Sequence, residues 1–157
     1  MNDRHIRILA TAGVLAAAIF LLTAFIRIPL PAGYLNLGDF GVFLAAMLLP
    51  AGWAALTAGV GSMLADLVGF PLYAPVTFAV KGLAALVFSL LWRHLSGGRR
   101  YLAFLAVLIV PLGYFAFERI VFANFAWADL PMNLLQATVG AGLALSADHA
   151  TKRRFSV

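Results

Sequence analysis

The stretch PVTFAVKGLAALVFSLLW (residues 75–92) decides the fold, because it is long and apolar enough to cross a bilayer. Its single charge, Lys81, costs about 2.5–3.5 kcal/mol at a bilayer centre on insertion scales. Such a residue usually faces the inside of a helix bundle or a cavity, where it meets a partner. The stretch therefore predicts a membrane helix with a buried cation.

The composition of the whole chain has the same character. Of the 157 residues, 64% are hydrophobic and 11% are charged, whereas soluble domains average about 25% charged residues. The net charge of +5 does not indicate nucleic-acid binding, because the basic residues lie in short loops and tails rather than in a patch. There is no cysteine, and the three histidines do not cluster, so we expect no metal and no cofactor.

Apolar runs separated by Pro, Gly and charged residues predict an all-α integral membrane protein, a bundle of six transmembrane helices in one membrane domain, 1–157. Pro29 disfavours continuation of the first helix into the loop 30–38, Pro50 ends the second, and Pro111 predicts a kink in the fifth. The second helix would cover only about 16 Å, so one span over 39–59 is the alternative. The predicted helices are about 8–26, 39–49, 53–69, 75–92, 101–122 and 131–147.

The basic residues predict the orientation of the bundle. With six spans, both tails, the turn between the second and third helices and the loop between the fourth and fifth fall on one side, and Arg27 falls on the other. Because cytoplasmic loops are rich in Lys and Arg, we expect both termini in the cytoplasm. We also expect the chain to lie in the plasma membrane of a prokaryote. The cytoplasmic set is Arg4, Arg7, Arg93, Arg99, Arg100, Lys152, Arg153 and Arg154.

The charged and amide side chains within the predicted helices all fall in the outer half of this bundle. An outward-facing polar cavity, capped by the outer loops, explains this distribution better than scattered ion pairs do. The residues concerned are Asp39, Asp66, Lys81, Glu118, Arg119, Asn133 and Gln136.

A pocket of carboxylates, amides and aromatic rings suits a small, flat, polar heterocycle, with Glu118, Asn133 and Gln136 as the strongest candidates for ligand contact. Asp66 and Lys81 are predicted to form a structural ion pair, and Arg119 either to point outward or to neutralise Glu118. The indole of Trp127 is equally typical of an interfacial aromatic belt. The predicted substrate-binding set is Glu118, Asn133, Gln136, Tyr114, Tyr73, Trp127, Asn36, Tyr34 and Lys81.

Three longer strings carry a family resemblance: PLPAGYLNLGDFGVFLAAMLLP (29–50), GSMLADLVGFPLYAPVTFAVKGL (61–83) and PMNLLQATVG (131–140). Together they resemble the S components, the substrate-binding membrane subunits, of energy-coupling factor (ECF) vitamin transporters. The nearest branch is the one associated with hydroxymethylpyrimidine, thiazole or pyridoxine-type compounds. The resemblance implies six helices, cytoplasmic termini and an external pocket roofed by the loop between the first and second helices.

The resemblance also implies partners. Such a subunit cannot transport alone, and it docks on a transmembrane T component that carries two cytoplasmic ATPases. The small-residue motif of the first helix that contacts the T component would map to Ala12 and Ala16, with Gly13 and Ala17 as an equally placed pair. Packing of this face within the same chain is the alternative. The chain lacks the G-x-x-x-x-G-K-[S/T] phosphate loop, so ATP hydrolysis by that route must come from a partner.

Two other functions compete with a transport subunit. A stand-alone ion-coupled carrier would favour inverted repeats, and the sequence shows none. An intramembrane enzyme could use Ser62, which follows Gly61, but a serine nucleophile needs a base within hydrogen-bond reach. No histidine lies at membrane depth, which leaves Lys81 as the candidate base. Because the usual base of a serine enzyme is missing there, we expect that the chain is not an enzyme.

Overall fold

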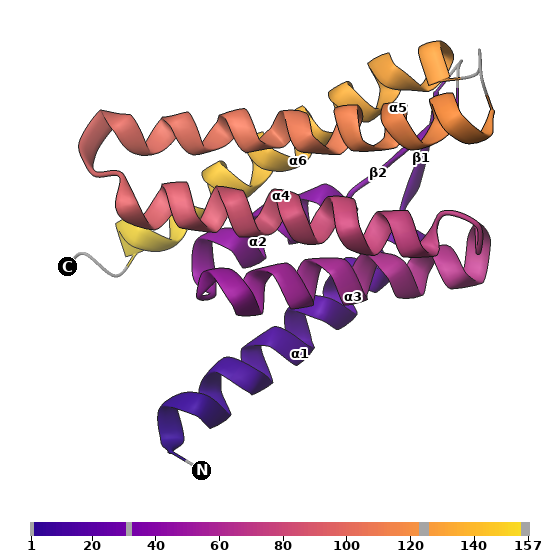
Figure 1. The fold of residues 1–157 in the computed structure, drawn as a ribbon. Coiled ribbons are helices and arrows are strands. Elements are labelled where there is room, and N and C mark those ends of the chain that lie inside the picture. The colour runs from indigo at the N-terminus through magenta and orange to yellow at the C-terminus, as the bar shows by residue number, and fades with distance from the viewer. Residues whose placement is uncertain (1, 31–32, 123–125, 155–157) are drawn as a thin grey trace.

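The computed structural model describes residues 2–30, 33–122 and 126–154, and these residues form helices apart from a short β-hairpin (Figure 1). The order of elements is α1 (Asp3–Ala24), β1 (Arg27–Leu30), β2 (Gly33–Asn36), α2 (Gly38–Leu48), α3 (Ala51–Gly69), α4 (Ala74–His94), the 3₁₀ helix η1 (Gly97–Leu108), α5 (Ile109–Val121) and α6 (Ala126–Arg154).

Four helical segments are long and apolar enough to cross a membrane: Asp3–Ala24, Ala51–Gly69, Ala74–His94 and Gly97–Val121. Helix α2 is apolar but shorter. It ends where Leu49 and Pro50 turn to extended backbone, with ψ of 153° and 147°. The alternative of one continuous span over 39–59 is therefore corrected to two helices, because Pro50 cannot continue α2.

The predicted helix 101–122 differs from the structure, where 3₁₀ helix η1 is followed by α-helix α5. Pro111 lies just inside α5, and because it has no N–H and its ring crowds the preceding turn, regular α-helical bonding is interrupted there. The predicted sixth helix begins too late, since α6 starts at Ala126 with Pro131 inside it. The predicted end at residue 147 is too early, because the helix continues to Arg154.

The segment after α1 is a hairpin rather than the predicted loop. Strands β1 and β2 pair antiparallel, with Arg27 opposite Asn36 and Leu30 opposite Gly33. The side chain of Asn36 then accepts a hydrogen bond from the N–H of Gly38 at 2.9 Å, at the first residue of α2. This bond fixes the hairpin against the start of α2, which carries Asp39 into the bundle.

Glycines allow two close helix contacts that position the site. A Cβ on Gly61 of α3 would stand 2.7 Å from the carbonyl oxygen of Ala16 in α1. A Cβ on Gly140 of α6 would stand 2.6 Å from the Cβ of Asp39 and 2.7 Å from the backbone N of Phe40. Small residues let membrane helices approach this closely. The buried core around these contacts includes Ile19, Val42, Phe43 and Phe88.

The two ends of the bundle carry different segments (Figure 1). Both marked chain ends and the connection from α4 to η1 lie toward one end. The hairpin, the connection from α3 to α4, and the facing ends of α5 and α6 lie toward the other. Residues distant in sequence are thus brought together at the hairpin end, and the main cavity opens there among them.

Candidate functional site

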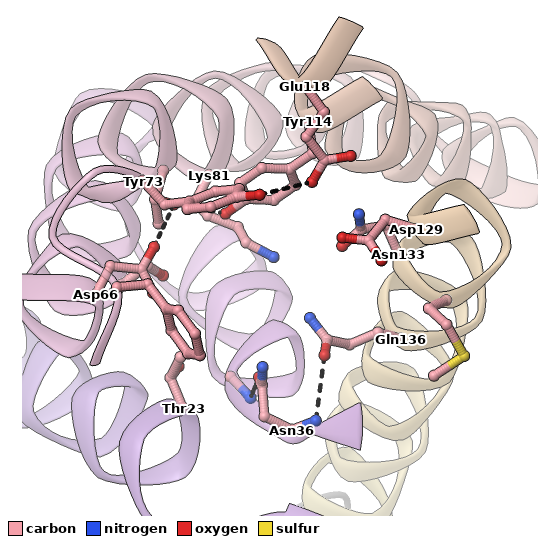
Figure 2. Close-up of a pocket in the computed structure, with 15 residues that line it drawn as sticks. Thr23, Asn36, Asp66, Tyr73, Lys81, Tyr114, Glu118, Asp129, Asn133 and Gln136 are labelled. Carbon is pink, nitrogen blue, oxygen red and sulfur yellow. Dashed lines mark hydrogen bonds between the residues drawn. The ribbon is translucent and has the colours of Figure 1, made fainter. Parts of the chain in front are cut away.

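A cavity of about 310 Å³ lies between the hairpin end of the helices and is lined mainly by polar and aromatic side chains. Every α-helix contributes to it, and so does β2. The lining residues are Thr23, Asn36, Gly38, Ser62, Asp66, Phe70, Tyr73, Thr77, Lys81, Tyr114, Glu118, Asp129, Met132, Asn133 and Gln136. Figure 2 shows the labelled side chains of Asp66, Lys81, Glu118, Asn133 and Gln136 arranged around a common space.

Lys81 forms its ion pair with Asp39, not with Asp66. Its Nζ lies 2.5 Å from Asp39 Oδ1, and both side chains are almost completely buried. The predicted Asp66–Lys81 pair is therefore corrected, although Lys81 remains close enough to Asp66 to act on it electrostatically. The reason is tertiary: the close approach of α6 to α2 at Gly140 brings Asp39 inward to meet α4. Lys81 also lies 5.4 Å from the centre of the Tyr114 ring.

Gln136 joins three parts of the wall. Its Nε2 donates to Asp39 Oδ2 at 3.0 Å, while its Oε1 accepts from the backbone N–H of Asn36 at 3.1 Å. The amide thus ties α6 both to the ion pair and to the hairpin. Asp39 has a donor on each carboxylate oxygen, Lys81 on one and Gln136 on the other. This part of the site is satisfied without a ligand.

A chain of hydroxyl groups satisfies Asp66. The Thr77 hydroxyl donates to Asp66 Oδ2 at 2.5 Å and lies 2.8 Å from the Tyr114 hydroxyl. A threonine hydroxyl has only one proton to give. With that proton on Asp66, the Tyr114 hydroxyl must be the donor to Thr77. The order Tyr114, Thr77, Asp66 therefore runs from α5 through α4 to α3.

Glu118 is the carboxylate that lacks a complete set of partners. It is 1% exposed, its Oε1 accepts from the Tyr73 hydroxyl at 3.3 Å, and its Oε2 has no hydrogen-bond partner among the described residues. Burial, and next the charge of Glu118, raise the pKa of Tyr73 well above its ordinary value, so Tyr73 stays a donor. Figure 2 shows Asp129 and Asn133 of α6 near Glu118 at one end of the cavity.

The structure brings most of the predicted ligand residues together. Seven of the nine predicted residues line the cavity: Glu118, Asn133, Gln136, Tyr114, Tyr73, Asn36 and Lys81. Trp127 does not, because it is 62% exposed and packs against the edge of Phe115 at a centroid distance of 4.8 Å. The side chain of Tyr34 lies outside the described part of the chain. Arg119 is exposed and does not line the cavity.

Sequence reasoning missed several wall residues. The predicted helix 131–147 excludes Asp129, whereas α6 carries Asp129, Asn133 and Gln136 at helical spacing. Thr77 lies one turn before Lys81 on α4, which was the available signal for it. Thr23 and Met132 gave no signal in the sequence beyond their position near helix ends.

Ser62 lines the cavity, but its hydroxyl is hydrogen-bonded to no base among the described residues. Its hydroxyl is 2% exposed and has no hydrogen-bond partner among the described residues. Lys81, the candidate base, is held by Asp39. The arrangement lacks the hydrogen-bonded nucleophile and base that a serine enzyme requires.

The two candidate small-residue pairs on α1 face different ways. Ala12 is buried, and the carbonyl oxygen of Ala16 abuts Gly61 of α3. Gly13 and Ala17 are exposed, and nothing lies within 4 Å of a Cβ placed on Gly13. The expected docking pair Ala12 and Ala16 therefore packs within the chain, and Gly13 and Ala17 form the outward pair.

Comparison with known proteins agrees with a transport subunit. Residues 4–152 match the family described as ECF-type riboflavin transporter, S component. The chain is also 30% identical over 143 residues to an uncharacterised protein from Pyrococcus woesei, covering 88% of this chain and 97% of that protein. The match confirms the predicted S component and the expectation that the chain is not an enzyme. The protein is a multi-pass membrane protein. It belongs to the ECF-type riboflavin transporter S component family, whose members bind a small substrate and work with a T component and ATPases.

Proposed function

We propose that this S component captures a vitamin precursor of the thiamine-pyrimidine, thiazole or vitamin B6 type from outside the cell. The observation that carries the proposal is the cavity itself, in which the buried Glu118 Oε2 has no described partner. A buried acceptor without a donor is costly, and a bound ligand supplies the donor. The cavity volume of about 310 Å³ is at the small end of the range for ligand sites.

The aromatic side of the cavity supports a flat ligand. Tyr73 and Tyr114 both line it, with ring centroids 6.3 Å apart. Flat heterocycles stack on or against such rings while polar groups at the ring edge fix orientation. Asn133, which lines the same cavity, offers an amide to such an edge.

The proposal includes six spans with both termini in the cytoplasm, so that the hairpin end faces outward. The chain has no cysteine, and single cysteines can therefore report sidedness. In intact cells a membrane-impermeant maleimide should label Leu72→Cys, between α3 and α4, and should reach Gly98→Cys only after permeabilisation. Labelling of Gly98→Cys alone in intact cells would reverse the orientation.

We also propose that the outward face of α1 docks on the T component. Gly13→Leu and Ala17→Leu should lose co-purification with a co-expressed T component while ligand binding by the isolated subunit persists. Ala79→Leu is the matched control, because Ala79 is an exposed alanine on α4. Equal loss in Ala79→Leu would show that any bulk on the lipid face disrupts assembly.

The ligand is tested on the purified full chain. Hydroxymethylpyrimidine, hydroxyethylthiazole and pyridoxine should be screened by thermal shift, then by titration, with riboflavin included because the matched family carries that name. Saturable binding by a precursor supports the proposal. If riboflavin alone binds, riboflavin and not a precursor is the ligand. If none of the four compounds binds, the proposal is overturned. Uptake that needs no ATPase partner and collapses with an uncoupler would favour an ion-coupled carrier.

A further inference from the structure

The charges that line the cavity do not balance. Among the described lining residues, Asp66, Glu118 and Asp129 are acidic and Lys81 is basic. Asp39, just behind the wall, takes the charge of Lys81 in the buried ion pair. The lining therefore presents more negative than positive charge to whatever enters.

The carboxylates differ in how far the protein satisfies them. Asp39 receives a donor on each oxygen, and Asp66 receives the Thr77 hydroxyl and lies within the electrostatic reach of Lys81 and Arg27. Glu118 accepts from the Tyr73 hydroxyl on Oε1, and its Oε2 has no hydrogen-bond partner among the described residues. The surplus of negative charge is therefore concentrated at the α5–α6 end of the cavity.

The neighbour that faces Glu118 makes this end more acidic. Asp129 acts on the Glu118 carboxyl as a like charge, and the two acids are also close enough to share a hydrogen bond when one of them holds a proton. Two carboxylates in one partly dry site repel each other, and a positive group between them relieves the repulsion. Figure 2 shows both carboxylates, with the amide of Asn133, directed into the same end of the cavity.

We propose that this end binds a protonated amine or another cationic N–H group of the substrate, held between Glu118 and Asp129. This assignment rests on the proposed function and narrows it to cationic, amine-bearing heterocycles, with phosphorylated forms rejected. The Tyr73 ring adds an aromatic face beside the charge. At the α1–α3 side, Ser62, whose hydroxyl has no described partner, and Thr23 take a neutral polar group of the same ligand.

Matched probes that differ in the charge of one substituent test the assignment. One set is the 2-methyl-4-aminopyrimidine ring with a 5-aminomethyl group, a 5-hydroxymethyl group or the phosphate ester of the latter. The other set is pyridoxamine, pyridoxine and pyridoxine 5′-phosphate. In at least one set the amine should bind at least tenfold more tightly than the alcohol, and the phosphate should not bind. Equal or tighter binding of the alcohols overturns the cation assignment and leaves the proposed function standing, whereas binding of riboflavin alone overturns both. Absence of binding by every probe in both sets overturns the cation assignment, and absence of hydroxyethylthiazole binding as well overturns the proposed function.

Variants then assign any preference to particular groups. Glu118→Gln keeps the shape and removes the charge, so the preference for amine over alcohol should fall at least tenfold. Asp129→Asn should lower the same ratio and serves if Glu118→Gln fails to fold. Asp3→Asn is the control, because it changes net charge by the same amount at the exposed start of α1. An unchanged ratio in both cavity variants contradicts the assignment.

Discussion

Asp39 and Glu118 are both buried carboxylates in the same site, yet they differ in how many of their oxygens have a hydrogen-bond partner in the protein. Asp39 is 0% exposed and has Lys81 on one oxygen and Gln136 on the other. Glu118 is 1% exposed and has one oxygen without a described partner. Burial alone therefore does not distinguish a structural acid from one that meets a ligand. The feature that distinguishes them is the number of carboxylate oxygens that accept a hydrogen bond from the protein.

The surroundings of the two acids explain the difference. Asp39 lies where α2, α4 and α6 are pressed together by the close contact at Gly140, so protein donors reach both its oxygens. Glu118 faces open cavity and a second acid, Asp129. One end of the cavity is thus part of the folded framework, and we propose that a ligand completes the other end.

Breaking the ion pair at Lys81 should have the largest effect. Lys81→Met leaves Asp39 charged, buried and without its cation, which typically costs about 3–5 kcal/mol. We expect loss of expression or a much lower unfolding free energy in mild detergent. The double variant Asp39→Asn/Lys81→Met should recover a large part of the loss, because no unpaired charge remains. A double variant as unstable as Lys81→Met alone would contradict the pairing.

Filling the space at Gly140 should come next. Gly140→Ala places a Cβ against the backbone of Asp39 and Phe40, at 2.7 Å from the Asp39 carbonyl carbon. Because backbone cannot swing aside, we expect a loss of about 3 kcal/mol, the upper end of the range for overpacking. Gly142→Ala on the same helix is the control, since nothing lies within 4 Å of its added Cβ. Equal stability of the two variants would mean that α2 and α6 are further apart.

Removing the Gln136 amide should have a smaller effect on both stability and binding. Gln136→Ala deletes the hydrogen bonds to Asp39 and to the Asn36 N–H. We expect a loss of about 2 kcal/mol in unfolding free energy. Ligand affinity should fall as well, because the hairpin loses its tie to α6. Hydrogen exchange of the β1–β2 amides measures that tie directly, and unchanged protection would assign the loss to Asp39 alone.

These contrasts also show what could be inferred from the sequence. The membrane class, the break at Pro50 and the gathering of polar residues at one end follow from apolar length, proline chemistry and charge placement. The choice of Asp39 over Asp66 for Lys81 does not, because three acids lay at similar depth. That choice depends on how closely α2 and α6 pack at Gly140, which is a tertiary contact. The hairpin was missed because its four-residue strands are too short to show an alternating pattern.

The smallest expected change in stability sharpens the comparison most. Glu118→Gln and Asp39→Asn make the same chemical change, from carboxylate to amide, at two buried positions. In Asp39→Asn the ion pair is lost and Lys81 is stranded, so a loss of several kcal/mol is expected. In Glu118→Gln the new amide accepts from Tyr73 and donates toward Asp129, which removes a like-charge repulsion. The unfolding free energy of the ligand-free protein should therefore stay level or rise by up to about 1 kcal/mol. Ligand binding by the same variant should nevertheless weaken at least tenfold. A loss of stability in Glu118→Gln equal to that in Asp39→Asn would make both acids structural and would move the ligand to another part of the cavity.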